Sequence, residues 1–142
     1  MNYSFVEIGG MAGLTLVAYA DDSTIGLSIQ PSQTRLDELP NKANVVKMTA
    51  DLNAISLTEI FETHEVEKIN MFYVYTENGN DGTIVQQLVP VISSWEPSNR
   101  PMVIRFGPTT DLDALHVCIL SFEALGYEVD RSSGSVEMFR LN

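Results

Sequence analysis

The alternation of apolar and polar residues at the start of the chain predicts three short strands. Tyr3 to Ile8 is rich in aromatic and β-branched residues, which favours a strand. Leu14 to Tyr19 is a second apolar run and Thr24 to Ile29 a third, with the turn-forming residues 21–23 between them. We therefore expect the second and third runs to form an N-terminal β-hairpin.

The following segment predicts a long connection, a short strand and a helix. Residues 30–44 are rich in proline and polar side chains, with one helical turn expected around Arg35 to Leu39. Val45 to Met48 has the composition of a short strand. Ser56 and Glu59 have the spacing of a capping box, so we expect a helix from Leu57 to about His64.

The second half of the chain alternates strands with helices. Lys68 to Tyr75 predicts a strand, and apolar residues from Ile84 to Trp95 recur at helical spacing. Pro90 interrupts that helical pattern, so the helix should kink or stop before it. Pro101 to Phe106 predicts the next strand.

The last part predicts a well-formed helix and a closing hairpin. Thr110 and Asp111 precede apolar residues at helical spacing, and Gly126 follows them as a natural C-terminal cap, so a helix from about Asp111 to Leu125 is expected. The residues on either side of positions 131–134 then read as two strands, 127–130 and 135–141.

These elements predict an α/β protein, with an α+β arrangement as the alternative. We expect one compact domain over residues 1–142, in which helices pack on a mixed β-sheet. The N-terminal hairpin and a β-α-β-α-β-β second half are its expected parts. The order of the strands in the sheet does not follow from the pattern.

Charge narrows the partners of this domain. Nineteen Asp and Glu residues stand against eight Lys and Arg, a formal net charge of −11 on 142 residues. Such a charge repels phosphate backbones and anionic membranes, so neither direct nucleic-acid binding nor membrane binding is expected. A hydrophobic content of 44% indicates a folded domain. One cysteine, Cys118, and the lack of a basic segment before the first apolar residues favour the cytoplasm.

The acidic residues are concentrated in the middle of the chain. Residues 51–81 hold seven acids and one base, a net charge of −6. This segment is either a solvated face or a surface that matches a basic partner. The residues predicted to bind such a partner are Glu59, Glu62, Glu65, Glu67, Glu77 and Asp81.

A glycine-rich loop offers a different kind of site. Residues 9–13, Gly-Gly-Met-Ala-Gly, follow a predicted strand, and exposed N–H groups in such a loop can hold an anion. No Lys-Ser or Lys-Thr follows, so the loop is not a P-loop, and a flexible connection is the alternative interpretation. The residues of this predicted ligand site are Gly9, Gly10, Gly13, Arg105 and Thr110.

Other candidates for chemistry have structural explanations as well. Asp111 and Asp113 have a spacing that suits Mg²⁺ but also that of N-terminal helix acids. Residues 62–67 combine Glu and His, with only His116 as a second histidine, and they also suit a solvated helix end. Cys118 lies on an apolar helix, where a buried thiol is the simpler interpretation of a candidate nucleophile. We therefore predict no catalytic residues, no metal and no cofactor.

Three functional hypotheses follow, and the first two do not depend on an enzymatic activity. The first is a small acidic binding protein that inhibits or regulates a protein partner by occluding a basic, nucleic-acid-binding surface. The alternative is an oligomeric protein that binds a nucleotide or another anion through residues 9–13, with homo-oligomerisation left open. A metal-dependent enzyme that uses Asp111 and Asp113 is a third hypothesis.

Overall fold

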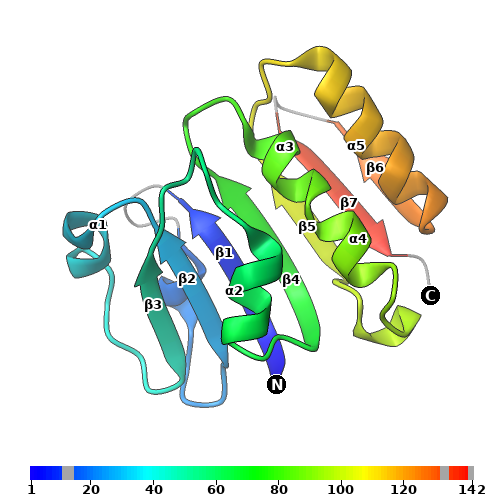
Figure 1. Ribbon diagram of the computed structural model, residues 1–142. Helices are drawn as coiled ribbons and strands as arrows, with labels where there is room; N and C mark the ends of the chain where they lie inside the picture. Colours follow the sequence, from blue (N-terminus) through cyan, green and yellow to red (C-terminus); the bar gives the residue numbers. More distant parts are fainter. Residues whose placement is uncertain (11–14, 132–134, 141–142) are drawn as a thin grey trace.

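Seven strands form one mixed sheet at the centre of the protein (Figure 1). The computed structural model describes residues 1–10, 15–131 and 135–140, and the strand order is β3-β2-β1-β4-β5-β7-β6. Neighbours from β3 to β5 pair in parallel, whereas β7 is antiparallel to both β5 and β6. The strands are β1 (Asn2–Gly9), β2 (Gly26–Gln30), β3 (Val45–Thr49), β4 (Lys68–Tyr75), β5 (Val103–Phe106), β6 (Tyr127–Asp130) and β7 (Val136–Arg140).

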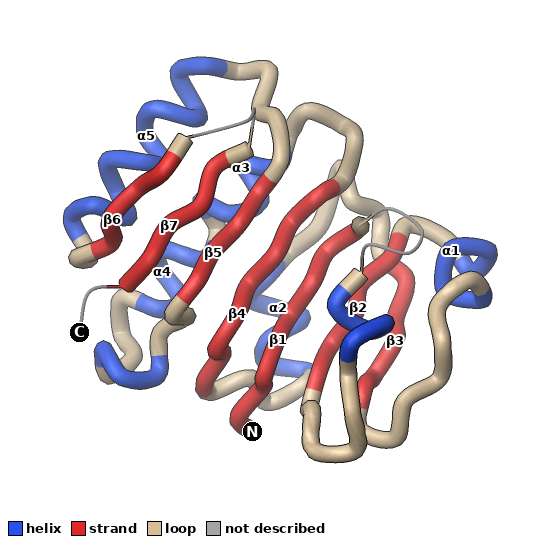
Figure 2. Tube along the Cα trace, turned by 180° about the vertical axis from the view of Figure 1, so that it is seen from behind, coloured by secondary structure: helices blue, strands red, loops and turns tan. Residues whose placement is uncertain are grey.

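The helices are short except for the last one. Figures 1 and 2 show that α2, α3, α4 and α5 lie on one side of the sheet, here called the covered face. On the opposite side, the described residues contribute only α1 and the 3-10 helix η1, both toward β1, β2 and β3. The helices are η1 (Leu16–Tyr19), α1 (Gln33–Asp37), α2 (Leu57–Thr63), α3 (Asp81–Gln86), α4 (Leu88–Ile92), η2 (Pro97–Asn99) and α5 (Leu112–Ala124).

The main core lies between the sheet and the covered-face helices. Its largest fully buried side chains are Phe72 from β4, Phe106 from β5 and Phe122 from α5. A smaller cluster on the opposite side joins Phe5 and Val17 to α1. The other side of β4, β5, β7 and β6 carries no helix among the described residues, and we call it the open face (Figure 2).

Local signals in the sequence explain the ends of the helices. The Asp111 carboxylate accepts hydrogen bonds from the N–H groups of Asp113 and Ala114, both at 3.1 Å, so Asp111, and not Thr110, caps α5. Gly126 follows with a φ of 94°, as a C-terminal glycine should. The helical pattern from Ile84 to Trp95 divides into α3 and α4. Pro90 then lies in the first turn of α4, where its missing N–H leaves no hydrogen bond unmade.

The structure confirms the α/β class, the single mixed sheet and the closing hairpin, but the predicted N-terminal hairpin is wrong. β1 and β2 pair in parallel, with Val6 opposite Leu27. The described part of the predicted strand 14–19 is η1, because the Glu7 carboxylate accepts hydrogen bonds from the N–H groups of Leu16 and Val17 and so holds a helical turn. A short apolar run has no periodicity that separates strand from helix, which explains the error.

Candidate functional site

The order of the strands places a switch point between β1 and β4. From β1 the chain continues to β2 and β3 on one side, and from β4 it continues to β5 on the other. In open α/β sheets, ligands bind at such a point, in the crevice beyond the carboxyl ends of the parallel strands. The loops that begin at Gly9 and Thr76 meet there, so this edge is the place to look for a site.

Glycine lets the two backbones approach closely at the switch point. The N–H of Gly10 donates to the carbonyl of Tyr75 at 2.8 Å. Gly9 has a φ of 76°, and a Cβ added to it would lie 2.1 Å from the Tyr75 oxygen. Only glycine combines this backbone angle with this contact. The two predicted loop glycines therefore have a structural role, whereas Gly13 lies outside the described residues.

One register position places a polar side chain or a tyrosine on every strand of the sheet. Glu7 of β1 lies opposite Ser28 on one side and opposite Tyr73 on the other. The line continues outward through the partners of Tyr73 and Ser28 to both edges of the sheet. In sheet order its members are Lys47, Ser28, Glu7, Tyr73, Arg105, Glu137 and Asp130. We call this line the polar rung. It lies on the side of the sheet that faces away from the main core.

Glu7 is the least ordinary member of the polar rung, because its carboxylate is buried. The side chain is 3% exposed, and its Oε1 accepts hydrogen bonds from Leu16 N (2.6 Å) and Val17 N (3.3 Å). Its Oε2 is also buried and has no hydrogen-bond partner among the residues that the structure describes. Burial raises the pKa of Glu7 to about 7, against the partial compensation of the two N–H groups and of the nearby Ser28 hydroxyl.

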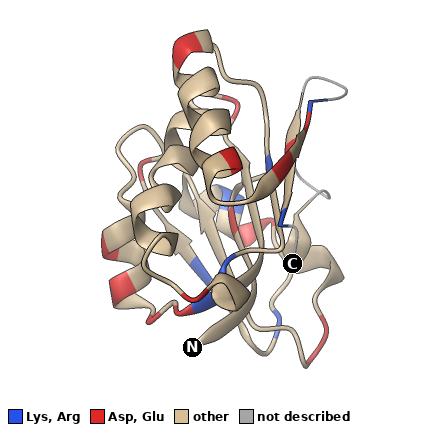
Figure 3. Ribbon diagram, turned by 90° about the vertical axis from the view of Figure 1, so that its right-hand side faces the viewer, with Lys and Arg blue, Asp and Glu red and all other residues tan. Residues whose placement is uncertain are grey.

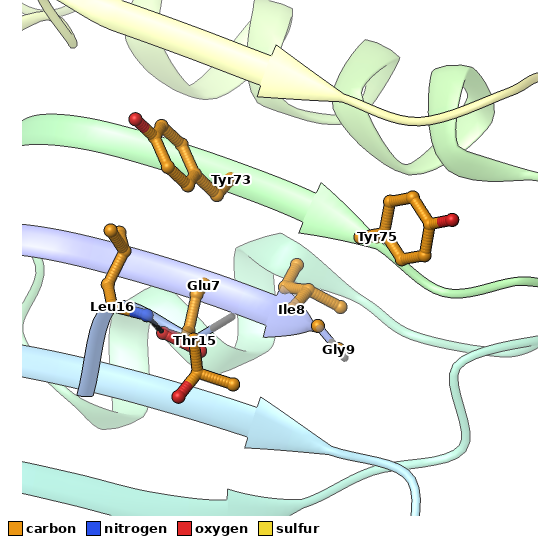
Figure 4. Close-up of a pocket in the computed structure, with 8 residues that line it drawn as sticks. Glu7, Ile8, Gly9, Thr15, Leu16, Tyr73 and Tyr75 are labelled. Atoms are coloured by element: carbon orange, nitrogen blue, oxygen red, sulfur yellow. Dashed lines mark hydrogen bonds between the residues drawn. The ribbon is translucent and has the colours of Figure 1, made fainter. Parts of the chain in front are cut away.

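Glu7 lines a small cavity beside two tyrosines (Figure 4). The cavity has a volume of about 50 Å³, and its lining includes Gly10, Thr15, Tyr73 and Tyr75. A larger hollow of about 380 Å³ shares Gly10 and both tyrosines and extends over the ends of β4 and β5 toward Arg105 and Ser135. The two spaces share three lining residues and therefore lie side by side.

Arg105 of β5 lies next to Tyr73, on the side away from Glu7. Its Nε donates to Glu137 Oε2 at 2.6 Å, and its guanidinium lies 5.2 Å from the centre of the Tyr73 ring. The hydrogen bond to Glu137 raises the pKa of Arg105. The predicted ligand residue Arg105 is thus already neutralised by a neighbour on the same rung. Thr110 lies in the connection before α5, where its hydroxyl donates to the Gly79 carbonyl at 3.2 Å.

Asp81 has a structural position that the sequence did not predict. It is 1% exposed, and its carboxylate accepts hydrogen bonds from Thr76 Oγ1 at 2.5 Å and from Gly107 N at 3.1 Å. Burial raises the pKa of Asp81. These bonds tie the end of β4 to the end of β5, so Asp81 belongs to no exposed partner surface.

The remaining predicted acids do not form one patch. Figure 3 shows acidic positions spread over several elements. Glu62, Glu65 and Glu67 lie before β4, whereas Glu77 follows it. Because β4 has eight residues, its first and last residues lie about 23 Å apart at about 3.3 Å per residue. Glu59 lies in the first turn of α2 and is exposed.

The other candidates for chemistry have ordinary positions in the fold. Cys118 is buried, which raises its pKa to about 12, so the simpler interpretation of a buried thiol is confirmed. Asp111 is engaged as the cap of α5. Within residues 1–10, 15–131 and 135–140, no three His, Cys, Asp or Glu side chains gather as a metal ion requires.

Sequence reasoning missed the three side chains that define this site, Glu7, Tyr73 and Tyr75. A signal for Glu7 was present, since it is a charged residue among the apolar residues Phe5, Val6 and Ile8 of one strand. The tyrosines alternate with Phe72 and Val74 along β4, which marks the opposite side of that strand.

Comparisons with known proteins show the fold of this chain. No protein-family model and no curated protein sequence matches it. A fibrillarin pre-rRNA processing protein from Methanococcus jannaschii superposes with a TM-score of 0.57 at 14% identity, over 96% of this chain and 65% of that protein. Fibrillarin in a fibrillarin/Nop5p complex gives a TM-score of 0.54 at 14% identity, over 96% of this chain and 72% of that one. The chain therefore has a Rossmann-like α/β fold similar to that of these structures, and it spans about two thirds of the length of these neighbours.

This likeness corrects the leading functional hypothesis. The fibrillarin structures share the fold of this chain and give no support to an acidic inhibitor that occludes a basic surface. The acids behind that hypothesis are divided between the two ends of β4, and one of them is buried. The alternative, an anion held by the loop at 9–13, loses one of its donors because the Gly10 N–H is bonded to Tyr75. None of the described helices is both long enough and apolar enough to span a membrane.

Proposed function

We propose that this chain is a ligand-binding domain that holds a small organic molecule at the switch point, on the open face of its sheet. The observation that carries the proposal is the unpartnered, buried Oε2 of Glu7 beside a cavity that adjoins a larger hollow. Buried polar atoms in native proteins nearly always have a partner, so an unpaired one beside an open hollow indicates a ligand or water.

The site differs from those Rossmann-like sites that bind a cofactor through its ribose hydroxyls. Rossmann-like dinucleotide folds place a carboxylate at the end of the second strand, where it binds ribose hydroxyls. This chain has Gln30 there, and its Nε2 donates to the Gly9 carbonyl at 2.7 Å and to Ser28 Oγ at 3.1 Å. In addition, η1 is a single short turn and not a full helix. The described residues therefore do not match a ribose-binding site of this kind.

Charge further restricts the ligand. The polar rung carries Glu7 at its centre, and Arg105 is paired with Glu137. The guanidinium of Arg35 donates to the Gly10 carbonyl and forms an ion pair with Glu38. A phosphate would therefore meet a carboxylate and no free cation among these residues. Although the fold neighbours include a pre-rRNA processing protein, a net charge of −11 leads us to propose that nucleic acid is not a direct ligand. The cytoplasmic location stays a prediction.

Thermal unfolding with a panel of nucleosides, amino acids, sugars, alcohols and amines tests the proposal. A ligand that binds only the folded protein, at about 100 times its Kd, adds about 2.7 kcal/mol of stability and raises the Tm by several degrees. Tyr75→Ala should abolish that shift, because Tyr75 lines both spaces. The matched control is Tyr19→Ala, since Tyr19 is 77% exposed on η1 and should leave the shift intact. A panel in which no compound raises the Tm of the wild type contradicts the proposal.

A second observation favours a protein partner at another surface, and we propose one there. Phe61 and Trp95 stack at 6.3 Å in a groove of about 450 Å³ between α2 and α4, and Glu62, Glu65 and Glu67 line the same groove. An apolar groove lined by carboxylates suits a basic, amphipathic segment. The support from the fold neighbours is limited to one of them having been solved with Nop5p.

Association kinetics test the second proposal. Once affinity purification has identified a partner, the variant with Glu62, Glu65 and Glu67 all changed to Gln should associate more slowly. The association rate of the wild type should also fall as salt is added. The matched control changes Glu123 and Glu128, which are exposed acids on α5 and β6, to Gln. Equal rates for both variants and the wild type, at all salt concentrations, contradict this surface.

A further inference from the structure

We infer that the group of the ligand that reaches Glu7 is a primary ammonium, so that the site takes organic amines. This inference rests on the proposed function, because it specifies the chemistry of the same hollow. Its starting point is that Glu7 Oε2 is a buried acceptor without a donor, in a residue that is 3% exposed and lines a cavity. The missing partner must therefore supply an N–H or O–H group.

The surroundings of Glu7 favour a positive donor over a neutral one. Two backbone N–H groups already serve Oε1, but no Lys or Arg forms an ion pair with Glu7 among the described residues. Tyr73 and Tyr75 line the same cavity, and aromatic faces attract cations. A hydrogen bond from a charged donor to a carboxylate is also about twice as strong as a neutral one.

The polar rung already shows this pattern on its other side. Arg105, a cation, lies between the Tyr73 ring and the Glu137 carboxylate. An ammonium between Glu7 and Tyr73 would repeat the same sequence of carboxylate, cation and ring about the same tyrosine. Tyr73 would then have a cation on each side, one beside Glu7 and the other, Arg105, beside Glu137.

Size restricts the amine to a small head on a larger body. A buried water needs about 10–15 Å³ of such space, so the cavity of about 50 Å³ beside Glu7 admits a head group of only a few heavy atoms. The adjoining hollow of about 380 Å³, which includes Phe106 and Gly107 in its lining, has room for a ring or an alkyl chain. A primary ammonium fits the inner space, whereas a trimethylammonium is bulkier and has no N–H for Oε2.

Matched pairs of ligands separate this inference from the proposed function. Binding of 2-phenylethylamine, its N,N,N-trimethyl analogue and 2-phenylethanol would be measured by calorimetry at pH 8, with cyclohexylamine and cyclohexanol as a second pair. We expect at least one primary amine to bind more than tenfold tighter than its alcohol, and 2-phenylethylamine to bind tighter than its trimethyl analogue. Glu7→Gln should reduce the amine-to-alcohol ratio to about one, while Glu128→Gln, an exposed acid on β6, should leave it unchanged.

A second variant keeps the inference open to test if Glu7→Gln fails to fold. Tyr73→Leu replaces a half-buried ring and should weaken amine binding more than alcohol binding. Alcohols that bind as tightly as their amines overturn the ammonium and leave the proposed function standing. An amine preference that survives Glu7→Gln places the cation elsewhere and overturns the inference as well. If no compound of either kind binds, and none of the wider panel does, the proposed function fails with it.

Discussion

The two faces of the central sheet are made by the same strands but meet different surroundings. On the covered face, Phe72, Ile104 and Met138 are fully buried under α2 to α5. On the open face, their chain neighbours Tyr73, Arg105 and Glu137 remain partly or largely exposed. Parallel strands are usually buried on both sides. The second side of β4, β5 and β7 is instead polar and aromatic, as suits a surface that receives a ligand.

The two halves of that second side differ as well. Over β1 and β2, η1 and α1 bury Phe5, Val17 and Leu36 in a small apolar cluster. Over β4 and β5, no described helix continues this layer (Figure 2). Glu7 lies at the boundary between the two halves, which explains how one carboxylate is buried by η1 and still lines a cavity. The site is thus a product of where the second layer ends.

The largest effect on stability is expected from a comparison of two adjacent residues of β4 that point to opposite faces of the sheet. Phe72→Ala should lower the free energy of unfolding by about 3–5 kcal/mol, because it leaves a cavity in the main core. Tyr73→Ala should cost about 1 kcal/mol or less, since its ring is only partly buried and water can fill the space. Urea unfolding of both variants measures the difference. Equal losses would show that the open face is a second core.

The next test uses the pH dependence of stability. The pKa of Glu7 rises from 4.5 when unfolded to about 7 when folded. The folded protein therefore holds the proton more tightly, and stability falls as pH rises from about 4.5 to about 7. This loss amounts to about 3 kcal/mol and is complete above that range. Glu7→Gln should remove this dependence. The unfolding free energy of the wild type minus that of the variant should therefore fall as the pH rises from about 4.5 to about 7.

Urea unfolding at pH 5, 6, 7 and 8 gives that difference directly. Asp81, whose pKa burial also raises, is present in both proteins and cancels. Glu128→Gln, an exposed acid on the open face, serves as the control and should show no such trend. A wild-type minus Glu7→Gln difference that stays constant from pH 5 to pH 8 would mean that Glu7 is not desolvated.

A smaller effect is expected at the helix that covers β6 and β7. Asp111→Ala removes the acceptor for the N–H groups of Asp113 and Ala114 and should cost about 1 kcal/mol. Asp113→Ala is the matched control and should cost less, because Asp113 lies two residues further along, in the first turn, and does not cap the helix. Thermal unfolding measures both changes. An identical Tm for the two variants would remove the capping role.

The smallest effect belongs to the open face itself. Glu137→Gln breaks the pair with Arg105, whose side chain is 50% exposed, and should cost less than about 1 kcal/mol. The loss should shrink further in 1 M salt, because screening weakens exposed ion pairs. Urea unfolding at low and high salt checks this. A loss of several kcal/mol that salt does not change would indicate a buried, structural pair.

Much of the local structure could be predicted because its causes are local. β4 has the predicted bounds, α2 begins directly after its predicted cap, Ser56, and α5 begins one residue later than predicted. Of the residues around the candidate site, the sequence singled out Gly9, Gly10 and Arg105, and their role in binding stays a prediction. Glu7 and the two tyrosines were missed, because their shared face depends on β1, β4 and β5 being neighbours.

By itself, the sequence determined where most strands and helices lie, which residues of each strand share a side, and the acidic character of the surface. Those properties depend on periods of two and 3.6 residues, on caps and on composition, all of which act over a few positions. Only the tertiary structure decided that β1 pairs in parallel with both β2 and β4, that η1 buries Glu7, and that no described helix covers one side of β4. Strand order sets which distant residues meet, and a period of two marks a side of a strand but never names the neighbouring strand.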